Sequence, residues 1–105
     1  MNNIICLDFA ALSTDVEVIG ITVNRGENQT EIDLRRTSKK VIDGEVFYDV
    51  WISEASARSM QEADEIVIGL NRDTEITGYG ISINGEEVKS AVVFEQAEYV
   101  DMPMR

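Results

Sequence analysis

Apolar residues in this chain recur mainly at every second position, and this period is what most constrains the fold. The alternation is strongest between residues 46 and 52, where one set of alternate positions holds Val46, Tyr48, Val50 and Ile52. Successive side chains of a β-strand point to opposite faces, whereas a helix repeats its faces every three to four residues. The pattern therefore predicts a mainly β protein.

Further strands and turns are expected along the chain. A change of parity between Val18 and Ile19 predicts a β-bulge. Asn84-Gly85 is typical of a hairpin turn, because both residues tolerate positive φ, and we expect a return strand that carries Val88, Val92 and Phe94. The basic stretch at 35–40 is predicted to be a loop. The remaining strands are expected near 18–23, 31–35, 66–70 and 77–83, with another turn at Asp43-Gly44.

One short helix is expected, from Ser53 to Ala63. Ser53 can cap its amino end and Glu54 suits the positive end of the helix dipole. Its apolar face is thin, so it would connect strands across one end of the fold. The sequence thus predicts one domain, residues 1–105, folded as a small β-barrel or sandwich of about six short strands with one connecting helix.

The residue inventory argues against an enzyme. The chain has no histidine and one cysteine, Cys6, which lies in an apolar run and is expected to be a buried, inert thiol. Without imidazole there is no general base of the usual kind and no histidine metal ligand. We expect no catalytic residues, no cofactor and no metal site.

The acidic charge is uneven and limits the class of partner. Residues 1–40 contain six acids and five bases, whereas residues 41–105 contain fourteen acids and four bases, a net charge of -10. Nucleic acids and anionic membranes would be repelled by such a surface, and basic proteins would be attracted. The charge can equally serve solubility alone. The apolar N-terminus lacks a basic region and contains Asp8, so we expect no secretion and a location in a host cytoplasm or in an assembled virion.

Two groups of residues are candidates for a protein interface. Phe47 and Trp51 share one face of a strand that is apolar on both faces, and they either pack in the core or anchor a partner. The only basic cluster is Arg35, Arg36, Lys39 and Lys40, which either balances local acids or contacts the acidic part of a second copy, and head-to-tail contacts of that kind build rings. Residues 1–12 and 96–105, the latter with Tyr99, are candidate docking segments.

Two stretches, WISEASARSMQEADEIVI (51–68) and ITGYGISINGEEVKSAV (76–92), present in succession a strand, a short helix, an aspartate and two strands that end in a hairpin. In this order, the region from Val50 to Val92 resembles small bacteriophage head–tail connector proteins, in which Gly-Asp usually stands where this chain has Ala63-Asp64. The resemblance implies a compact β-barrel that stacks as a ring between the capsid portal and the tail. It assigns no site residue.

Two functional hypotheses follow. The first is a non-enzymatic structural protein that assembles with copies of itself or with neighbours in a phage particle. The second is an acidic inhibitor, such as an immunity protein, an antitoxin, or an anti-restriction or anti-CRISPR protein, that occupies a basic site on an enzyme.

Overall fold

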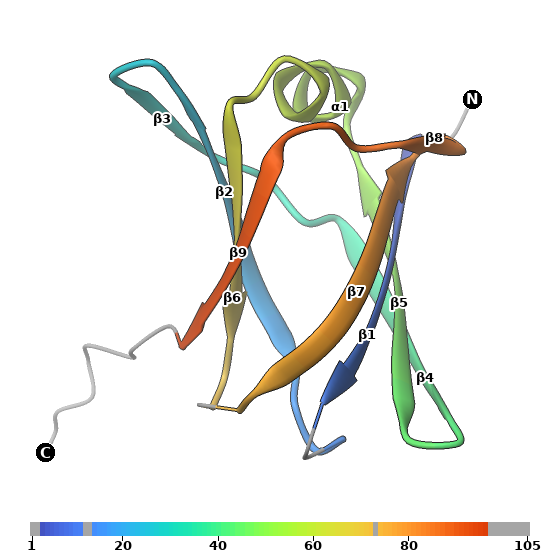
Figure 1. The fold of residues 1–105 in the computed structure, drawn as a ribbon. Helices are drawn as coiled ribbons and strands as arrows, with labels where there is room; N and C mark the ends of the chain where they lie inside the picture. Colours follow the sequence, from blue (N-terminus) through green and yellow to red (C-terminus); the bar gives the residue numbers. More distant parts are fainter. Residues whose placement is uncertain (1–2, 12–13, 73, 97–105) are drawn as a thin grey trace, which may run out of the picture.

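The computed structural model describes residues 3–11, 14–72 and 74–96, which form two β-sheets packed face to face with a helix across one end (Figure 1). The mainly β prediction is confirmed, and the sandwich is the architecture that fits, because the two sheets do not close into a barrel. These ranges contain nine strands, more than the six or so expected. In chain order the elements are β1 (Asn3–Ala11), β2 (Val18–Arg25), β3 (Asn28–Glu31), β4 (Arg36–Ile42), β5 (Glu45–Ile52), α1 (Glu54–Gln61), β6 (Glu65–Leu70), β7 (Ile76–Ile83), β8 (Glu86–Glu87) and β9 (Ala91–Gln96).

The larger sheet has the strand order β4-β5-β1-β7-β8 and is antiparallel throughout. The smaller sheet has the order β3-β2-β6-β9, in which β6 and β9 run parallel. Residues 32–35 join β3 to β4 on one side of the sandwich, and residues 88–90 join β8 to β9 on the other. Each side of the sandwich is therefore tied by a short connection.

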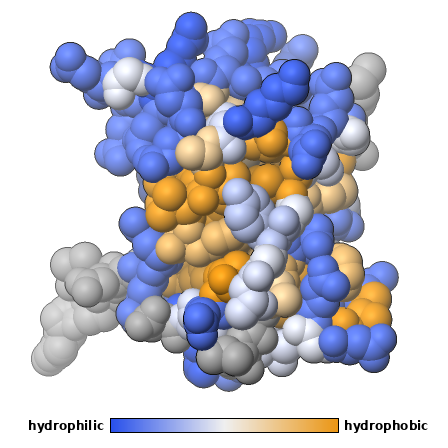
Figure 2. All heavy atoms as spheres, in the orientation of Figure 1, coloured by the Kyte–Doolittle hydropathy of each residue, from blue (hydrophilic) through white to orange (hydrophobic). Residues whose placement is uncertain are grey.

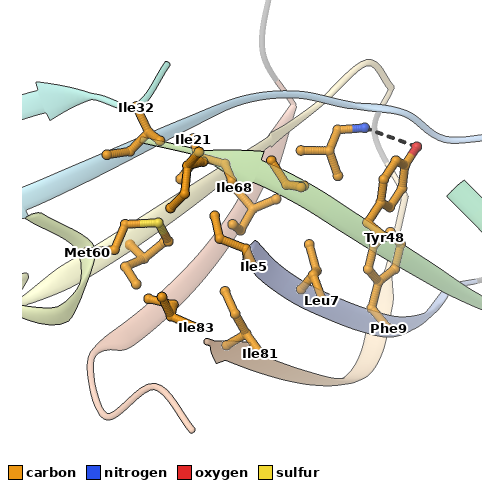
Figure 3. Packing of buried hydrophobic residues seen from close by; sticks show 14 of the residues in the cluster. Ile5, Leu7, Phe9, Ile21, Ile32, Tyr48, Met60, Ile68, Ile81 and Ile83 are labelled. Atoms are coloured by element: carbon orange, nitrogen blue, oxygen red, sulfur yellow. Dashed lines mark hydrogen bonds between the residues drawn. The ribbon is translucent and has the colours of Figure 1, made fainter. Parts of the chain in front are cut away.

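The core lies between the sheets and consists mainly of alternate residues of β1, β2, β5, β6 and β7 (Figure 3). On β5 the buried residues are those that the sequence pattern marks, and Phe47 and Trp51 point to the opposite face, where they are half-buried. No polar or charged residue is buried among the described residues. The other inner faces contribute Ile5, Leu7 and Phe9 of β1, Ile21 and Val23 of β2, Ile66, Ile68 and Leu70 of β6, and Ile81 and Ile83 of β7.

Both predicted tight turns are confirmed. Asp43 and Gly44 have φ values of 51° and 81°, and Asn84 and Gly85 have φ values of 53° and 88°. Two consecutive residues with positive φ make the hairpin turn whose twist matches that of the flanking strands. The bulge predicted between Val18 and Ile19 is also present, as a shift of register between Val18 and Gly20.

The helix prediction is confirmed. Ser53 caps α1, and its hydroxyl oxygen accepts a hydrogen bond from the amide of Ser56 at 3.0 Å. Ala57 and Met60 are the buried residues of α1, which covers the end of the sandwich at the top of Figure 1. Within the described ranges, no helix has the length and apolar character needed to cross a membrane.

The prediction of a loop at 35–40 is wrong, because most of this stretch belongs to β4, the edge strand of the larger sheet. Six of the seven residues of β4 are exposed, so the strand carries no apolar alternation by which to recognise it. Its pairing with β5 follows from the Asp43-Gly44 turn instead. The preceding expected strand at 31–35 is shifted, since β3 ends at Glu31.

The expected return strand after Asn84-Gly85 is also corrected. β8 ends at Glu87, and the chain then crosses to the smaller sheet, where β9 pairs parallel with β6. The hydroxyl of Ser90 donates a hydrogen bond to the carbonyl oxygen of Ala63 at 2.6 Å, which fixes this crossing. Val92 and Phe94 therefore pack beside Ile66 and Ile68 and do not pair with β7.

The N-terminal segment takes part in the fold itself. Asn3–Ala11 form β1, the central strand of the larger sheet, between β5 and β7. Most of the candidate docking segment 1–12 is thus a strand of the sandwich itself. Of the second candidate docking segment, 96–105, all residues after Gln96 lie outside the described residues.

Candidate interaction surface

Four of the candidate interface residues lie together on the outer face of the larger sheet. Arg36 is paired with Trp51, and Lys40 with Phe47, across the neighbouring strands β4 and β5. Directly opposed residues of paired strands project to the same side of a sheet. We call this group, Arg36, Lys40, Phe47 and Trp51, the basic–aromatic face.

The contact between Arg36 and Trp51 orders one end of this face. The guanidinium carbon of Arg36 lies 4.0 Å from the centre of the Trp51 ring. A guanidinium over an indole ring is a cation–π contact, worth about 0.5–1 kcal/mol at an exposed site. The contact holds a flat ring and a charged group side by side on an outer surface. Such a combination is enriched where proteins bind one another.

Lys39 lies apart from the basic–aromatic face. It is paired with Tyr48, whose side chain points into the core. Its ammonium donates a hydrogen bond to the carbonyl oxygen of Val16 at 2.8 Å and lies 3.1 Å from Oε2 of Glu17. Lys39 therefore links β4 to the segment before β2, and its charge is paired with that of Glu17 within the molecule.

The two remaining candidates are placed as follows. Arg35 is exposed in the connection before β4, and its amide donates to the carbonyl oxygen of Trp51 at 2.9 Å. It thus borders the basic–aromatic face at the end that holds Arg36. Tyr99 lies outside the described residues.

An acidic strip, Asp8, Glu45 and Asp49, adjoins the basic–aromatic face. Asp8 of β1 is paired with Phe47, and Asp49 of β5 with Cys6. A hydrogen bond to Asp8 raises the pKa of the Glu45 carboxyl above its ordinary value, with desolvation and the charge of Asp8 as smaller causes. The outer face is thus basic along β4 and alternately acidic and aromatic along β5, and Asp8 adds a further carboxylate on β1.

Gly80 makes room for the Asp8 side chain. Gly80 lies opposite Asp8 on β7, and a Cβ atom added to Gly80 would lie 2.8 Å from Oδ1 of Asp8. Gly78, two residues earlier on the same face, has no heavy atom within 4 Å of the corresponding position. The acidic strip was not predicted from the sequence, although the alternation of inward Leu7 and Phe9 with Asp8 indicates an outward carboxylate.

Cys6 is exposed, which corrects the expectation of a buried thiol. It lies on the outer face between Asp49 and Ser82. Partial desolvation, followed by the charge of Asp49 and a hydrogen bond to it, raises the pKa of the Cys6 thiol. The neutral thiol is a weak nucleophile, so partial desolvation together with the neighbouring carboxylate lowers the reactivity of this exposed thiol.

Nothing in the described ranges assembles a metal site from three or more acidic or cysteine side chains. An open groove of about 600 Å³ lies between the end of α1 and the β8–β9 connection, lined by Met60, Ile83 and Val88 with Glu86, Glu87 and Lys89. A ligand site usually encloses its ligand within apolar walls that carry a few convergent polar groups. This groove has no such convergence, and the basic–aromatic face remains the better candidate site.

A second apolar surface appears between β9 and β7. Figure 2 shows apolar residues reaching the surface in this region, which lies at the centre of the view. The ring of Phe94 lies 5.5 Å from that of Tyr79 and 5.5 Å from that of Phe9, so Phe94 bridges the two sheets. Tyr79 is exposed there, whereas Val93 is exposed on the opposite face of β9.

No family model matches the chain, and neither a curated protein nor a solved structure does so.

Proposed function

We propose that this protein is a non-enzymatic assembly protein that acts through contacts with other proteins, as a structural component of a bacteriophage particle at the junction of head and tail. The basic–aromatic face carries the proposal. The inner face of the larger sheet already supplies the core, so Phe47 and Trp51 on its outer face are available to a partner. Aromatic residues and arginine dominate the energetic centres of protein interfaces.

The assignment of this protein to a phage particle rests on the region from Val50 to Val92. Its succession of strand, short helix and hairpin is the one by which this chain resembles head–tail connector proteins. The partners are neighbouring virion proteins and further copies of this chain. Direct contact with nucleic acid is not expected, because residues 41–105 carry a net charge of -10.

The test is capture of partners from cells that are producing phage, with uninfected cells in parallel. The tagged chain is compared with Arg36→Glu, which removes the contact with Trp51, and with Arg58→Glu. Arg58 is exposed on α1, and its ion pair with Glu54 is 3.9 Å long, so Arg58→Glu is a matched charge reversal away from the face. We expect virion structural proteins with the unaltered chain and with Arg58→Glu, and their loss with Arg36→Glu.

Two results would count against the proposal. Recovery of no virion protein would remove the assembly role. Equal recovery by Arg36→Glu would remove the basic–aromatic face as its site. Circular dichroism of each variant confirms that it is folded.

A second function, the acidic inhibitor, is favoured by the charge asymmetry alone. A protein with a net charge of -11 is attracted to a basic nucleic-acid site at a rate that falls steeply with ionic strength. In the same capture experiment, this function predicts a single basic nuclease or toxin that is released by salt.

A further inference from the structure

Each sheet of the sandwich has two edge strands, and two of these four, β4 and β9, carry opposite charge. β4 begins the larger sheet and β9 ends the smaller one, so within the described residues each is hydrogen-bonded to another strand along one edge only. The connection 32–35 places β3 and β4 on one side, and the connection 88–90 places β8 and β9 on the other. Each side of a single copy therefore presents one edge strand of each sheet.

Among the described residues, three of the four most exposed large hydrophobic side chains lie on β4 and β9. These are Val41 (46%) and Ile42 (49%) on β4 and Val93 (38%) on β9, whereas the fourth, Tyr79 (49%), lies on β7, which is not an edge strand. Exposed apolar residues on an open strand edge favour pairing with another strand. These exposed residues suit a contact in which the β4 edge of one molecule pairs with the β9 edge of another.

The charges on the two edges are complementary. Lys40 projects from β4 two residues before Ile42, and Glu95 projects from β9 two residues after Val93. Neither Lys40 nor Glu95 forms an ion pair with another described residue. Two β4 edges would bring Arg36 and Lys40 against like charges, and lysine on an edge strand protects it from such pairing. An edge strand that carries an acid, such as β9 with Glu95, would not repel β4 in this way.

We propose that β4 of one copy pairs antiparallel with β9 of a second copy, with Ile42 opposite Val93. This pairing deepens the proposed assembly function and rests on it. The antiparallel register then places Val41 opposite Phe94 and Lys40 opposite Glu95. Val41 and Phe94 point toward the cores, whereas Ile42, Val93, Lys40 and Glu95 share the outer face. A shift by one residue would turn each side chain to the wrong face.

The contact is head-to-tail, because it joins two different surfaces. Each added copy exposes a new β4 or β9 edge, so assembly continues until a ring closes or a filament forms. The larger sheet of one copy continues through the contact into the smaller sheet of the next.

The test is sedimentation velocity of the purified chain and of charge-swapped variants. Lys40→Glu places two acids opposite each other, and Glu95→Lys places two bases opposite each other, so we expect each variant alone to remain monomeric. In an equimolar mixture, Glu at position 40 of one variant meets Lys at position 95 of the other, and the second contact of each copy pairs Lys40 with Glu95. The mixture should therefore recover the oligomers of the unaltered chain.

Matched controls carry the same charge changes elsewhere: Arg58→Glu on α1, and Glu27→Lys in the exposed turn between β2 and β3. Both should assemble as the unaltered chain does. The inference is overturned if the unaltered chain is monomeric, if either swapped variant assembles normally, or if the mixture fails to recover the oligomers. A monomeric chain that still captures virion proteins through Arg36 would overturn only this inference. Assembly with rescue, but without captured virion proteins, would overturn only the virion role.

Discussion

The phenol oxygen of Tyr48 lies 2.9 Å from the carbonyl oxygen of Val16 and donates a hydrogen bond to it. The same oxygen accepts a hydrogen bond from the amide of Val18 at 3.3 Å, which Figure 3 shows from close by. Val16 precedes β2 in the smaller sheet, whereas Tyr48 belongs to β5 in the larger one. This buried pair therefore ties the two sheets together at the edge of the core.

Tyr48→Phe should destabilise the fold by about 1–2 kcal/mol, because it leaves the buried amide of Val18 without an acceptor. Urea unfolding measures the change, with an unchanged dependence on denaturant concentration. Tyr79→Phe is the matched control. Tyr79 is exposed, so its hydroxyl is open to water and the change should stay within about 0.5 kcal/mol. Equal effects of the two substitutions would contradict the role given to Tyr48.

Alkaline pH should destabilise the unaltered chain more than Tyr48→Phe. Burial raises the pKa of Tyr48 above its ordinary value, and the neighbouring Glu17 adds to the shift. An acid whose pKa is higher in the folded state stabilises that state below its unfolded pKa, about 10 for tyrosine, and the contribution is lost as the pH rises further. The urea midpoint of each protein is measured from pH 9 upward. Lys39 and Cys6 are present in both proteins. An equal fall of the two urea midpoints would therefore show that Tyr48 does not contribute to the loss of stability at alkaline pH.

The free energy of unfolding should be about 1 kcal/mol lower for Gly80→Ala than for Gly78→Ala. Replacing glycine in a strand by alanine stabilises by roughly 0.4–1 kcal/mol where the new methyl group fits, because the unfolded chain loses freedom. The methyl group fits at Gly78 but collides with the Asp8 carboxylate at Gly80. The difference should disappear in an Asp8→Ala background. A difference that persists there would show that Asp8 is not its cause.

Glu45→Gln should raise the urea midpoint at pH 7 and weaken its dependence on pH in the acidic range. The pKa of Glu45 is raised, chiefly by its hydrogen bond to Asp8. Protonated Glu45 therefore stabilises the fold below its unfolded pKa, about 4.3, and this contribution is lost as the pH rises through the folded pKa. Glutamine cannot ionise and still supplies a donor. Glu87→Gln, exposed on β8, is the control and should change neither quantity.

The strands that the sequence predicts well are those whose alternation records burial on one face. Val46, Tyr48, Val50 and Ile52 are all in the core, so β5 is visible in the pattern. β4 is not, because it sits at the edge of its sheet with nearly every residue exposed, and only the Asp43-Gly44 turn signals it. The crossing to β9 is equally hidden, since Val88 and Val92 would have the same parity in a continuing hairpin. The contact of Ser90 with Ala63 joins residues far apart in sequence.

The sequence likewise predicts only those parts of the candidate surface that lie on a single strand. The spacing of Phe47 and Trp51 places both on one face of a strand, and the structure confirms that placement. The basic stretch was predicted to be a loop, so the alternation of its side chains between the two faces of a strand was not considered. That alternation places Arg36 and Lys40 on the outer face and Lys39 on the opposite face. The acidic strip and the two complementary edges depend on which strands become neighbours, and no local pattern encodes that.

The central place of β1 also orders events during synthesis. β1 is made first, but its neighbours begin only at Glu45 and Ile76. At about 5–20 residues per second, the interval from Phe9 to Ile83 lasts about 4–15 s. During that time the apolar face of Ile5, Leu7 and Phe9 has no complete sheet to join, and pairing between such distant segments is intrinsically slow. The window in which aggregation competes with folding is therefore set by translation of the central part of the chain, whatever the stability of the finished sandwich.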